Sequence, residues 1–298
     1  MKSVAMPVSA ATDPLPTKAH AEPHRLVCRD RSLVLDGSPK MVGIVNITDD
    51  SFFDGGRFAS TEAAVAQALK LVAEGAAMLD LGGQSTRPDY AEISAEEEIL
   101  RVVPVITSLI GKTLVPLSID TYKPAVARAA LVAGAHVLND IHGFQGDETL
   151  AQIVAETGCA VILMHNDAAY KTVHLDPIAA MLAFFDRSLA VAARVGVARE
   201  KIILDPGIGF AKTQEQNLSL LARLDELRVL GLPLLLGASR KSVIGNVLAL
   251  PAEERLEGTL ATTTLAVWQG VELIRVHDVC ANARAAKIAA AIRNYSKP

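Results

Sequence analysis

Short aliphatic runs, each followed by a longer amphipathic segment, predict an α/β fold of the (β/α)8, or TIM-barrel, type. Eight such units follow one another from Met41 to the end of the chain, and their span of about 250 residues is usual for this barrel. No break in composition divides the chain, so one barrel domain is predicted over residues 24–298. An open doubly wound sheet has the same local pattern and remains an alternative at this point.

The predicted strands are short and aliphatic, as expected for parallel strands that are buried on both faces. In chain order they are Met41–Val45, Met78–Leu81, Val115–Ile119, His136–Leu138, Val161–Met164, Ile202–Leu204, Leu234–Leu236 and Leu273–Val276. Helical periodicity predicts helices between them at Thr61–Glu74, Glu96–Leu109, Pro124–Ala133, Glu148–Glu156, Pro177–Val195, Gln214–Leu227, Gly258–Gln269 and Ala283–Arg293.

Local signals support the helix boundaries. Ser60 or Thr61 is expected to cap the first helix, and Ser94 with Glu97 forms a capping-box pattern before the second. Glycines occupy the positions at which several helices should end, namely Gly75, Gly134, Gly158 and Gly196. These residues therefore agree with the predicted helix boundaries.

Residues 1–23 differ from the rest of the chain. They are rich in Ala, Pro, Ser and Thr, and they show neither a strand nor a helix pattern. They also lack the continuous apolar region of a signal peptide. We expect a disordered N-terminal extension.

Charge and cysteine usage limit the class of protein. The formal net charge of -4 gives no electrostatic reason to expect nucleic acid, and no apolar stretch is long enough to span a bilayer. Cys28, Cys159 and Cys280 are far apart and form no CxxC pair or Cys/His cluster. The chain is therefore expected to be a cytoplasmic protein with reduced cysteines, without membrane or nucleic-acid partners.

Polar or charged residues stand at the carboxyl end of every predicted strand. They are Asn46, Asp80, Asp120, Asn139–Asp140, His165, Asp205, Ser239–Arg240–Lys241 and Arg275–His277. In a barrel the carboxyl ends of all strands share one face. One such residue would be a cap or a turn, whereas a polar group at all eight positions predicts a binding site.

This ring of residues contains two chemistries. Carboxylates and an amide, at Asp120, Asn139 and Asp205, suit the 2-amino-4-oxo edge of a flat heterocycle, because they accept parallel N–H bonds. The second group is cationic or neutral and polar, and it suits an anion such as phosphate. Its members are Asn46, Lys241, Arg275 and His277.

Structural roles compete with functional ones at several of these positions. Asp80 is as well explained by ordering the glycine loop after it, Asp140 by capping, and His165 by a satisfied place in the core. Met164 suits packing, although its thioether also suits the wall of a ring pocket. Lys241 is harder to explain structurally, since a long cation after a buried strand is costly without a partner.

Common nucleotide and hydrolase motifs are absent. Gly207 and Gly209 begin a GxGxxG pattern, but Lys212 stands where its last glycine belongs. There is no GxxxxGK[ST] phosphate loop, no HExxH and no nucleophilic triad order.

Seven sequence motifs, in the same order, resemble those of the dihydropteroate synthase family. They are NITDDSFFDGG (Asn46–Gly56), LGGQSTRP (Leu81–Pro88), SIDTYKP (Ser118–Pro124), LNDIHGF (Leu138–Phe144), LDPGIGFAKTQEQN (Leu204–Asn217), SRKSVIG (Ser239–Gly245) and RVHDV (Arg275–Val279). The resemblance implies a TIM barrel, usually a homodimer. It also implies synthesis of 7,8-dihydropteroate from 6-hydroxymethyl-7,8-dihydropterin pyrophosphate and p-aminobenzoate, with Mg2+ assisting.

The resemblance assigns roles to matching residues. Asp120, Asn139 and Asp205 would hold the pterin beside Lys241, while Arg275 and His277 would meet the pyrophosphate and Asn46 the magnesium ion. The substrate-binding residues would be Thr86, Arg87, Asp120, Asn139, Met164, Asp205, Phe210, Ser239, Lys241, Arg275 and His277. The residues expected to act in catalysis are Asp120, Lys241, Arg275 and His277.

The chain departs from the family pattern at a few positions. Asp49 and Phe53 stand in the first loop where the family has proline and serine, and Gln84 stands where it usually has glutamate. The segment Met164–Tyr170 also differs. Two other functions remain open at this point: a pterin-binding methyltransferase module with a corrinoid partner, and a non-catalytic pterin-binding protein.

Overall fold

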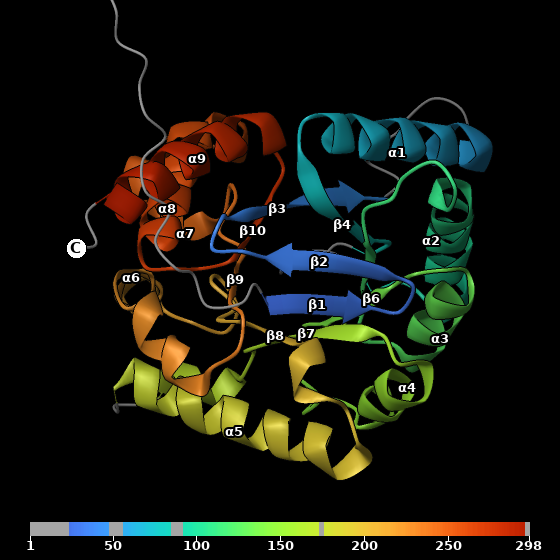
Figure 1. Cartoon of the computed structure of the whole chain (residues 1–298), viewed down its shortest axis with the longest axis horizontal. Coiled ribbons are helices and arrows are strands. Elements are labelled where there is room, and N and C mark those ends of the chain that lie inside the picture. The colour runs from blue at the N-terminus through green and yellow to red at the C-terminus, as the bar shows by residue number, and fades with distance from the viewer. Residues whose placement is uncertain (1–23, 48–55, 85–91, 173–175, 296–298) are drawn as a thin grey trace, which may run out of the picture.

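A ring of parallel strands surrounded by helices forms the fold (Figure 1). The computed structural model describes residues 24–47, 56–84, 92–172 and 176–295. Within these ranges the parallel strands are β3 (Lys40–Asn46), β4 (Ala76–Gly82), β5 (Leu117–Asp120), β6 (Val137–Asp140), β7 (Ala160–Met164), β8 (Ile202–Asp205), β9 (Leu235–Leu236) and β10 (Leu273–Val276).

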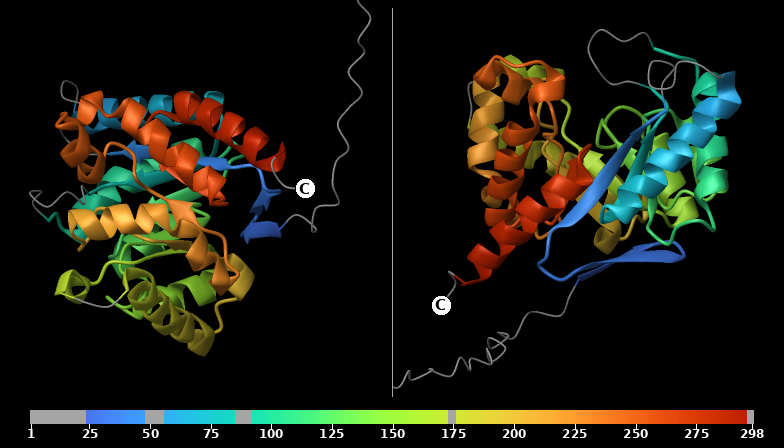
Figure 2. Two further views of the ribbon diagram at one scale, coloured as in Figure 1. Left: turned by 90° about the vertical axis from the view of Figure 1, so that its left-hand side faces the viewer. Right: turned by 90° about the horizontal axis from the view of Figure 1, so that it is seen from above.

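Helices lie on the outside of these strands (Figures 1 and 2). They are α1 (Gly56–Ala73), α2 (Ala95–Leu109), α3 (Pro124–Val132), α4 (Thr149–Thr157), α5 (Pro177–Val195), α6 (Gln214–Ala222), α7 (Ser242–Leu248), α8 (Leu256–Trp268) and α9 (Val279–Tyr295). Short 3-10 helices occupy Ala168–Thr172, Arg199–Lys201, Leu224–Leu230 and Ala252–Glu254.

The strand order closes the barrel. Neighbours follow the order β8-β7-β6-β5-β4-β3-β10-β9. The two outer strands of this order meet through a parallel bridge between Leu204 and Leu234, and the Leu204 amide donates to the Pro233 carbonyl at 2.9 Å. The barrel prediction is therefore confirmed, and the open doubly wound sheet is excluded.

An antiparallel hairpin, β1 (His24–Cys28) with β2 (Arg31–Leu35), was not predicted from the sequence. The sequence pattern that indicates this hairpin is short: apolar residues alternate with others on both sides of the turn at Arg29–Asp30. The buried face of the hairpin joins residues of the barrel interior, such as Val42 and Ile162, in one apolar cluster. Arg29 donates to the carbonyls of Leu131 and Ala135, so the hairpin lies across the end at which the strands begin.

Some helix boundaries differ from prediction. Helix α1 begins at Gly56, so Ser60 and Thr61 lie inside it and the predicted cap there is wrong. The hydroxyl of Ser94 does accept from the Glu97 amide at 3.1 Å, which confirms the N-cap of α2. The predicted helix Gln214–Leu227 is divided into α6 and a 3-10 helix, and α7 was not predicted.

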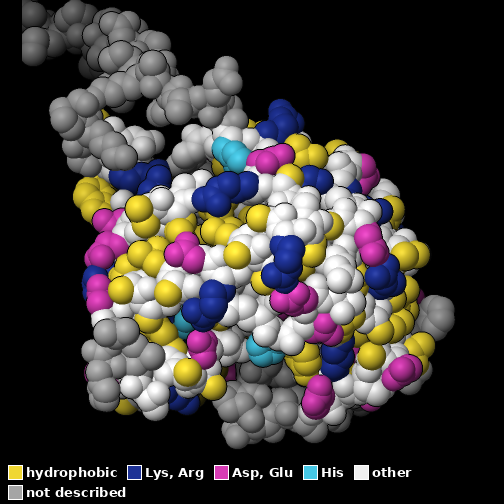
Figure 3. All heavy atoms as spheres, turned by 90° about the horizontal axis from the view of Figure 1, so that it is seen from below, with side chains coloured by type: hydrophobic (Ala, Val, Ile, Leu, Met, Phe, Trp, Pro, Cys, Tyr) yellow, Lys and Arg dark blue, Asp and Glu magenta, His cyan; other side chains and the backbone are white. Residues whose placement is uncertain are grey.

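The surface around α5 carries charges of both signs (Figure 3). Ion pairs on this side include Arg194 with Glu148 and Arg223 with Asp176. On this face neither sign forms a continuous patch (Figure 3). Among the described residues, no helix combines the length and apolar character needed to cross a membrane.

Candidate active site

Strand register brings the predicted site residues to one face of the barrel. Asp120 of β5 pairs with Asn139 of β6, and Met164 of β7 pairs with Asp205 of β8. Asn46 ends β3 opposite Gly82 of β4 and is exposed. Each of these residues ends its strand or stands one residue before the end, as the sequence predicts.

Arg275 stands at the centre of an acidic network. Its Nε donates to Asp80 Oδ2 at 2.5 Å and its Nη2 donates to Asp120 Oδ2 at 2.7 Å. Asn139 Nδ2 donates to the same Asp80 oxygen at 3.0 Å. Asp80 is fully buried, and its carboxylate holds Arg275 and Asn139 through these bonds. Its role is therefore wider than ordering the glycine loop that follows it.

Three buried oxygens of this network face no hydrogen-bond donor within the described part of the chain. They are Oδ1 of Asp80, Oδ1 of Asp120 and Oδ1 of Asn139. A buried acceptor without a donor costs about 1–3 kcal/mol, so such atoms are uncommon unless a ligand supplies the donor. All three are acceptors, so they match a ligand edge that is rich in N–H groups.

Burial and neighbouring charges shift the pKa values of the acidic and basic groups in this site. Burial raises the pKa of Asp120 to about 7, and the nearby Arg275 opposes this shift without cancelling it. Burial also raises the pKa of Asp205, with Lys241 opposing. For Arg275, burial opposes the charge, but the Asp80 and Asp120 carboxylates outweigh it and raise the pKa of the guanidinium. Arg275 therefore stays charged across the physiological range.

Lys241, which follows β9, lies over Phe210 in the loop after β8. Lys241 Nζ donates to the Ile208 carbonyl at 2.6 Å and lies 4.6 Å from the centroid of the Phe210 ring. Asp205 Oδ1 accepts from the Gly207 amide at 2.7 Å. Burial lowers the pKa of Lys241 to about 8, and Asp205 is the principal opposing charge.

Gly237, directly after β9, lies where Asp205, Lys241 and Arg275 converge. A Cβ at this position would lie 3.7 Å from Asp205 Oδ2 and 3.8 Å from both Lys241 Nζ and Arg275 Cδ, which are ordinary van der Waals distances. The strand end therefore places the carboxylate and the two cations around one point of the face.

Ser239 and His277 form a hydrogen-bonded pair. Ser239 Oγ lies 2.9 Å from His277 Nδ1 and accepts from the His277 backbone amide at 3.3 Å. The hydroxyl can donate to Nδ1 or accept from it, depending on the tautomer of the ring. Ser239 thus orients the imidazole of His277, which the sequence predicts to bind an anion.

The remaining predicted residues divide into three groups. Met164 is buried and packs against the loop after β8. Asp140 accepts from the amides of His142 and Phe144 at 2.9 and 2.6 Å, as expected of the capping role. His165 is buried among aromatic rings. Thr86 and Arg87 lie outside the described residues, as do Asp49 and Phe53.

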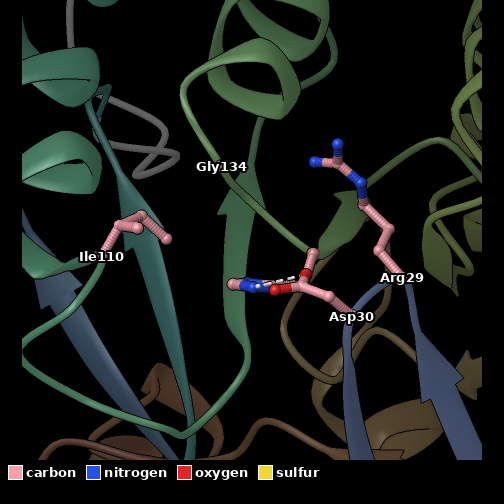
Figure 4. Close-up of a pocket in the computed structure, with 5 residues that line it drawn as sticks. Arg29, Asp30, Ile110 and Gly134 are labelled. Atoms are coloured by element: carbon pink, nitrogen blue, oxygen red, sulfur yellow. Dashed lines mark ion pairs between the residues drawn. The ribbon is translucent and has the colours of Figure 1, made fainter.

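A separate cavity of about 380 Å³ opens at the opposite end of the barrel (Figure 4). The hairpin turn, Ile110 and Gly134 line it together with His136, whose Nε2 lies 3.4 Å from Asp30 Oδ1. None of the predicted site residues lines this cavity. Its volume therefore does not identify the reactive face, whereas the buried acceptors do.

Comparisons with known proteins identify the family of this chain. The family model described as "Pterin binding enzyme" matches residues 42–277. The curated dihydropteroate synthase of Clostridium beijerinckii is 46% identical over 251 residues, which cover 83% of this chain and 92% of that protein. The chain belongs to the dihydropteroate synthase family. It is accordingly a transferase of folate synthesis, and the methyltransferase and non-catalytic alternatives are set aside.

Solved structures of the family share the fold. The Xanthomonas albilineans dihydropteroate synthase with 4-aminobenzoic acid has a TM-score of 0.86 at 41% identity, and the match covers 93% of this chain and all of that one. The Yersinia pestis enzyme in a sulfonamide drug complex has a TM-score of 0.84 at 39% identity, covering 91% of this chain and all of that one.

Two residues that touch the site were not predicted as functional. Asp80 braces Arg275 and Asn139, although the sequence left its role divided between the site and the loop. Lys212, which is buried, donates to the carbonyls of Gly207 and Phe210 in the loop after β8. A signal for Lys212 was present, because a lysine stands where the glycine-rich pattern of this loop is interrupted.

Proposed function

We propose that the chain condenses 6-hydroxymethyl-7,8-dihydropterin pyrophosphate with p-aminobenzoate at the carboxyl face of the barrel. The products are 7,8-dihydropteroate and pyrophosphate. The observation that carries this assignment of the face is the pair of buried acceptor oxygens, without hydrogen-bond donors, on Asp120 and Asn139. A pterin presents several N–H donors along one edge, and these would satisfy such acceptors.

Asp120, Asn139 and Asp205 bind the pterin edge in this proposal, with Met164 and Phe210 beside the ring. The Lys241 ammonium bonds the Ile208 carbonyl, in the loop that also carries Phe210. In this proposal it therefore reaches the carbonyl side of the ring. Arg275 and His277 meet the pyrophosphate. Arg275 carries a positive charge beside Asp120, and the His277 ring is held by Ser239.

The reaction is a substitution at the methylene carbon of the pterin. The carbon–oxygen bond breaks, and its electron pair leaves with pyrophosphate, which the cationic side chains stabilise. The methylene carbon and the ring share the resulting positive charge, and the ionised Asp120 stabilises that charge. The amine nitrogen of p-aminobenzoate then forms the new carbon–nitrogen bond and releases its proton to solvent.

Magnesium fits this face as a partner of the pyrophosphate. Among the described residues no cluster of His, Cys, Asp and Glu side chains is arranged to hold a metal, and Asn46 offers one exposed amide oxygen. Oxygen is the ligand that Mg2+ prefers, and this ion usually keeps water and phosphate oxygens. Asn46 would be its protein contact, and the bound ion would neutralise charge on the leaving group.

The second substrate lies beside Ser239 and Phe210 in this proposal, with Thr86 and Arg87 completing its pocket. The X. albilineans enzyme, whose structure contains 4-aminobenzoic acid, supports this substrate for the present chain. Ser239 is 6% exposed, and its hydroxyl is fixed by His277, so it offers a defined polar wall to the pocket.

We also propose a homodimer formed through α8 and α9. These helices pack against each other and expose large apolar side chains on their outer faces: Leu265, Trp268, Ile288, Ile292 and Tyr295. Exposed apolar residues that gather on adjacent elements mark interaction surfaces. A monomer at micromolar concentration in analytical ultracentrifugation would contradict this assembly.

The barrel domain, residues 24–298, is proposed to fold and act in the cytoplasm without the first 23 residues. Removing Met1–Glu22 should leave the melting temperature and activity nearly unchanged, because the described fold begins at β1. A large fall in melting temperature after this truncation would contradict the proposed boundary.

Radiolabelled p-aminobenzoate tests the activity directly. With pterin pyrophosphate and Mg2+ present, label should enter a product that comigrates with 7,8-dihydropteroate, and omission of the pterin substrate should abolish this product. Absence of labelled product under these conditions would contradict the proposed reaction.

A further inference from the structure

Lys212 is a buried lysine that the proposed reaction does not use. Its residue is 8% exposed, and its Nζ lies near four acceptors. It donates to the backbone carbonyls of Gly207 at 2.9 Å, Phe210 at 3.1 Å and His165 at 3.2 Å, and it lies 2.9 Å from His165 Nδ1. A long cation is costly to bury, so this concentration of acceptors calls for an explanation.

The loop bonded by Lys212 has an unusual backbone. Gly207, Gly209 and Ala211 have φ angles of 65°, 86° and 45°, in the left-handed region that disfavours most side chains. Gly207 also lies tightly against β7, since a Cβ there would come within 3.2 Å of Met164 Cγ. Such a backbone needs external partners to keep one conformation.

Two lysines donate hydrogen bonds to three backbone carbonyls of this loop. Lys212 bonds the carbonyls of Gly207 and Phe210, and Lys241 bonds the intervening carbonyl of Ile208 at 2.6 Å. Lys241 is a predicted ligand of the substrate. Lys212 is the more buried of the two, and its partners also include the end of β7.

His165 completes the set of acceptors. It packs against the rings of Tyr170 and Phe184, with centroids 4.7 and 4.5 Å away. Burial lowers the pKa of His165 to about 3, and the charge of Lys212 adds to this effect, so the ring is neutral and its Nδ1 accepts from the lysine. The buried histidine therefore serves the core and also receives the Lys212 ammonium.

Electrostatics connect Lys212 to the carboxylate at the start of the loop. Burial lowers the pKa of Lys212 to about 7, and Asp205 is the principal group that opposes this shift. Reciprocally, the positive charge of Lys212 favours the ionised form of Asp205. The lysine thus acts on the loop both through hydrogen bonds and through charge.

We propose that Lys212 is a positioning residue for the pterin: its ammonium fixes the Gly207–Phe210 backbone so that Asp205 and Phe210 face the ring. Lys212 itself does not touch the reacting atoms. The proposal rests on the proposed function, because it takes the Asp205 side of this loop as the pterin surface.

Lys212→Met tests this role, because it keeps the length of the side chain and removes the ammonium. Calorimetric titration with pteroic acid should show a dissociation constant raised by about tenfold or more, the scale of losing charged hydrogen bonds. The KM for the pterin substrate should rise in parallel, while kcat should change by less than about threefold, since no contact to the transition state is removed.

Lys201→Met is the matched control. Lys201 Nζ also donates to a backbone carbonyl, that of Gly158, at 2.5 Å, but it precedes β8 at the other end of the barrel. This variant should bind pteroic acid like the unmodified protein. A Lys212→Met protein with a lower melting temperature and an unchanged dissociation constant would overturn the proposal, because only a structural role would remain.

His165→Phe provides a second variant that suits the aromatic cluster. It removes one acceptor of Lys212 and leaves the three carbonyls, so affinity for pteroic acid should fall by a smaller factor, about two- to fivefold. Should Lys212→Met fail to fold, unchanged affinity in His165→Phe would overturn the proposal. An unmodified protein that does not bind pteroic acid would instead contradict the proposed function itself.

Discussion

Arg275 Nη2 lies 2.7 Å from Asp120 Oδ2, and this contact joins β10 to β5 across the mouth of the barrel. In the strand order, β3 and β4 stand between these two strands. Asp80 of β4 shares the same guanidinium, so one positive charge serves two carboxylates. The surplus negative charge at Asp120 is suited to a ligand that becomes cationic during reaction.

Replacing Asp120 by Asn should therefore affect turnover more than binding. The amide keeps the size of the side chain and one acceptor oxygen, but it removes the negative charge that opposes the cationic pterin. We expect kcat to fall by on the order of a hundredfold, with a smaller loss in affinity for the pterin substrate. Steady-state kinetics and calorimetry of the same preparation measure the two quantities.

Asp176→Asn is the control for this substitution, since Asp176 forms an exposed pair with Arg223 on the helical surface. It should leave kcat unchanged. If Asp120→Asn retains the turnover of the unmodified protein, Asp120 has no stabilising role in the transition state.

The pH dependence of kcat/KM should be bell-shaped with a narrow optimum. Ionised Asp120 is needed to accept from the pterin, so activity should rise with pH through about 7, the pKa to which burial raises this carboxyl. Protonated Lys241 and Lys212 are needed on the other side. Activity should therefore fall as these amines lose their protons, with the pKa values of about 8 and about 7 to which burial lowers them.

Two variants assign the limbs of this profile. Asp120→Asn should flatten the acidic limb, and Lys241→Met should remove the part of the basic limb that Lys241 contributes, each in kcat/KM measured from pH 5.5 to 9.5. A profile in which both limbs persist in both variants would assign the titrations to other groups. Because kcat/KM reports the free enzyme, the profile is compared directly with the pKa directions of these two residues.

The barrel and the composition of its reactive face follow from the sequence because both depend on local periodicity. Aliphatic runs place the strands, and the residue after each run reaches the carboxyl face whatever the distant packing is. Asp205 is an example: its position after Ile202–Leu204 is enough to assign it to the face. The hairpin at His24–Leu35 was less visible, because two five-residue strands give few repeats of the apolar alternation.

Partnerships within the face were not predictable in the same way. Asp80 and Arg275 are 195 residues apart in the chain, and only closure of the barrel brings them together. Lys212 presents a similar case, since its acceptors on His165 come from the previous strand. Sequence spacing predicts which side chains lie on the carboxyl face of the barrel. The fold determines which of them form hydrogen bonds and ion pairs with one another.

Metal binding should depend on the pyrophosphate substrate. Asn46 alone provides too few oxygens for a stable Mg2+ site, because this ion requires about six oxygen ligands in octahedral geometry. Calorimetric titration of Mg2+ should show no tight binding without substrate, and binding should appear when pyrophosphate is added. Tight stoichiometric Mg2+ in the absence of pyrophosphate would contradict Asn46 as the main protein contact.

Sulfonamides should compete with p-aminobenzoate. The STRP and SRKSVIG motifs are intact, and the Y. pestis relative has been solved in a sulfonamide complex. Phe53 is the departure that bears on this prediction, since exclusion of a mimic requires a feature that the smaller substrate avoids. An inhibition constant far above the KM for p-aminobenzoate, restored by Phe53→Ser, would reverse the prediction and locate its cause.

Arg240 should control the geometry of both cationic loops through its pair with Asp278. Arg240 stands between Ser239 and Lys241 in the chain, and its side chain donates to Asp278 through Nε at 3.0 Å and Nη2 at 2.8 Å. Its φ of 58° is unfavourable for a residue with a side chain, so the paired carboxylate helps to hold the turn. Asp278 directly follows His277, so the pair fixes the loop of Lys241 relative to the loop of His277.

Arg240→Ala should therefore raise the KM for the pterin pyrophosphate by about tenfold, the scale of losing a partly buried, two-pronged ion pair. Arg223→Ala is the matched control, because Arg223 binds Asp176 through two contacts of 2.6 and 2.9 Å away from the reactive face. Asp278→Ala should raise the same KM, and the double variant should be no worse than the poorer single one, because both remove one interaction. Fully additive effects in this cycle would show that the two residues act independently and that their pair does not align the loops.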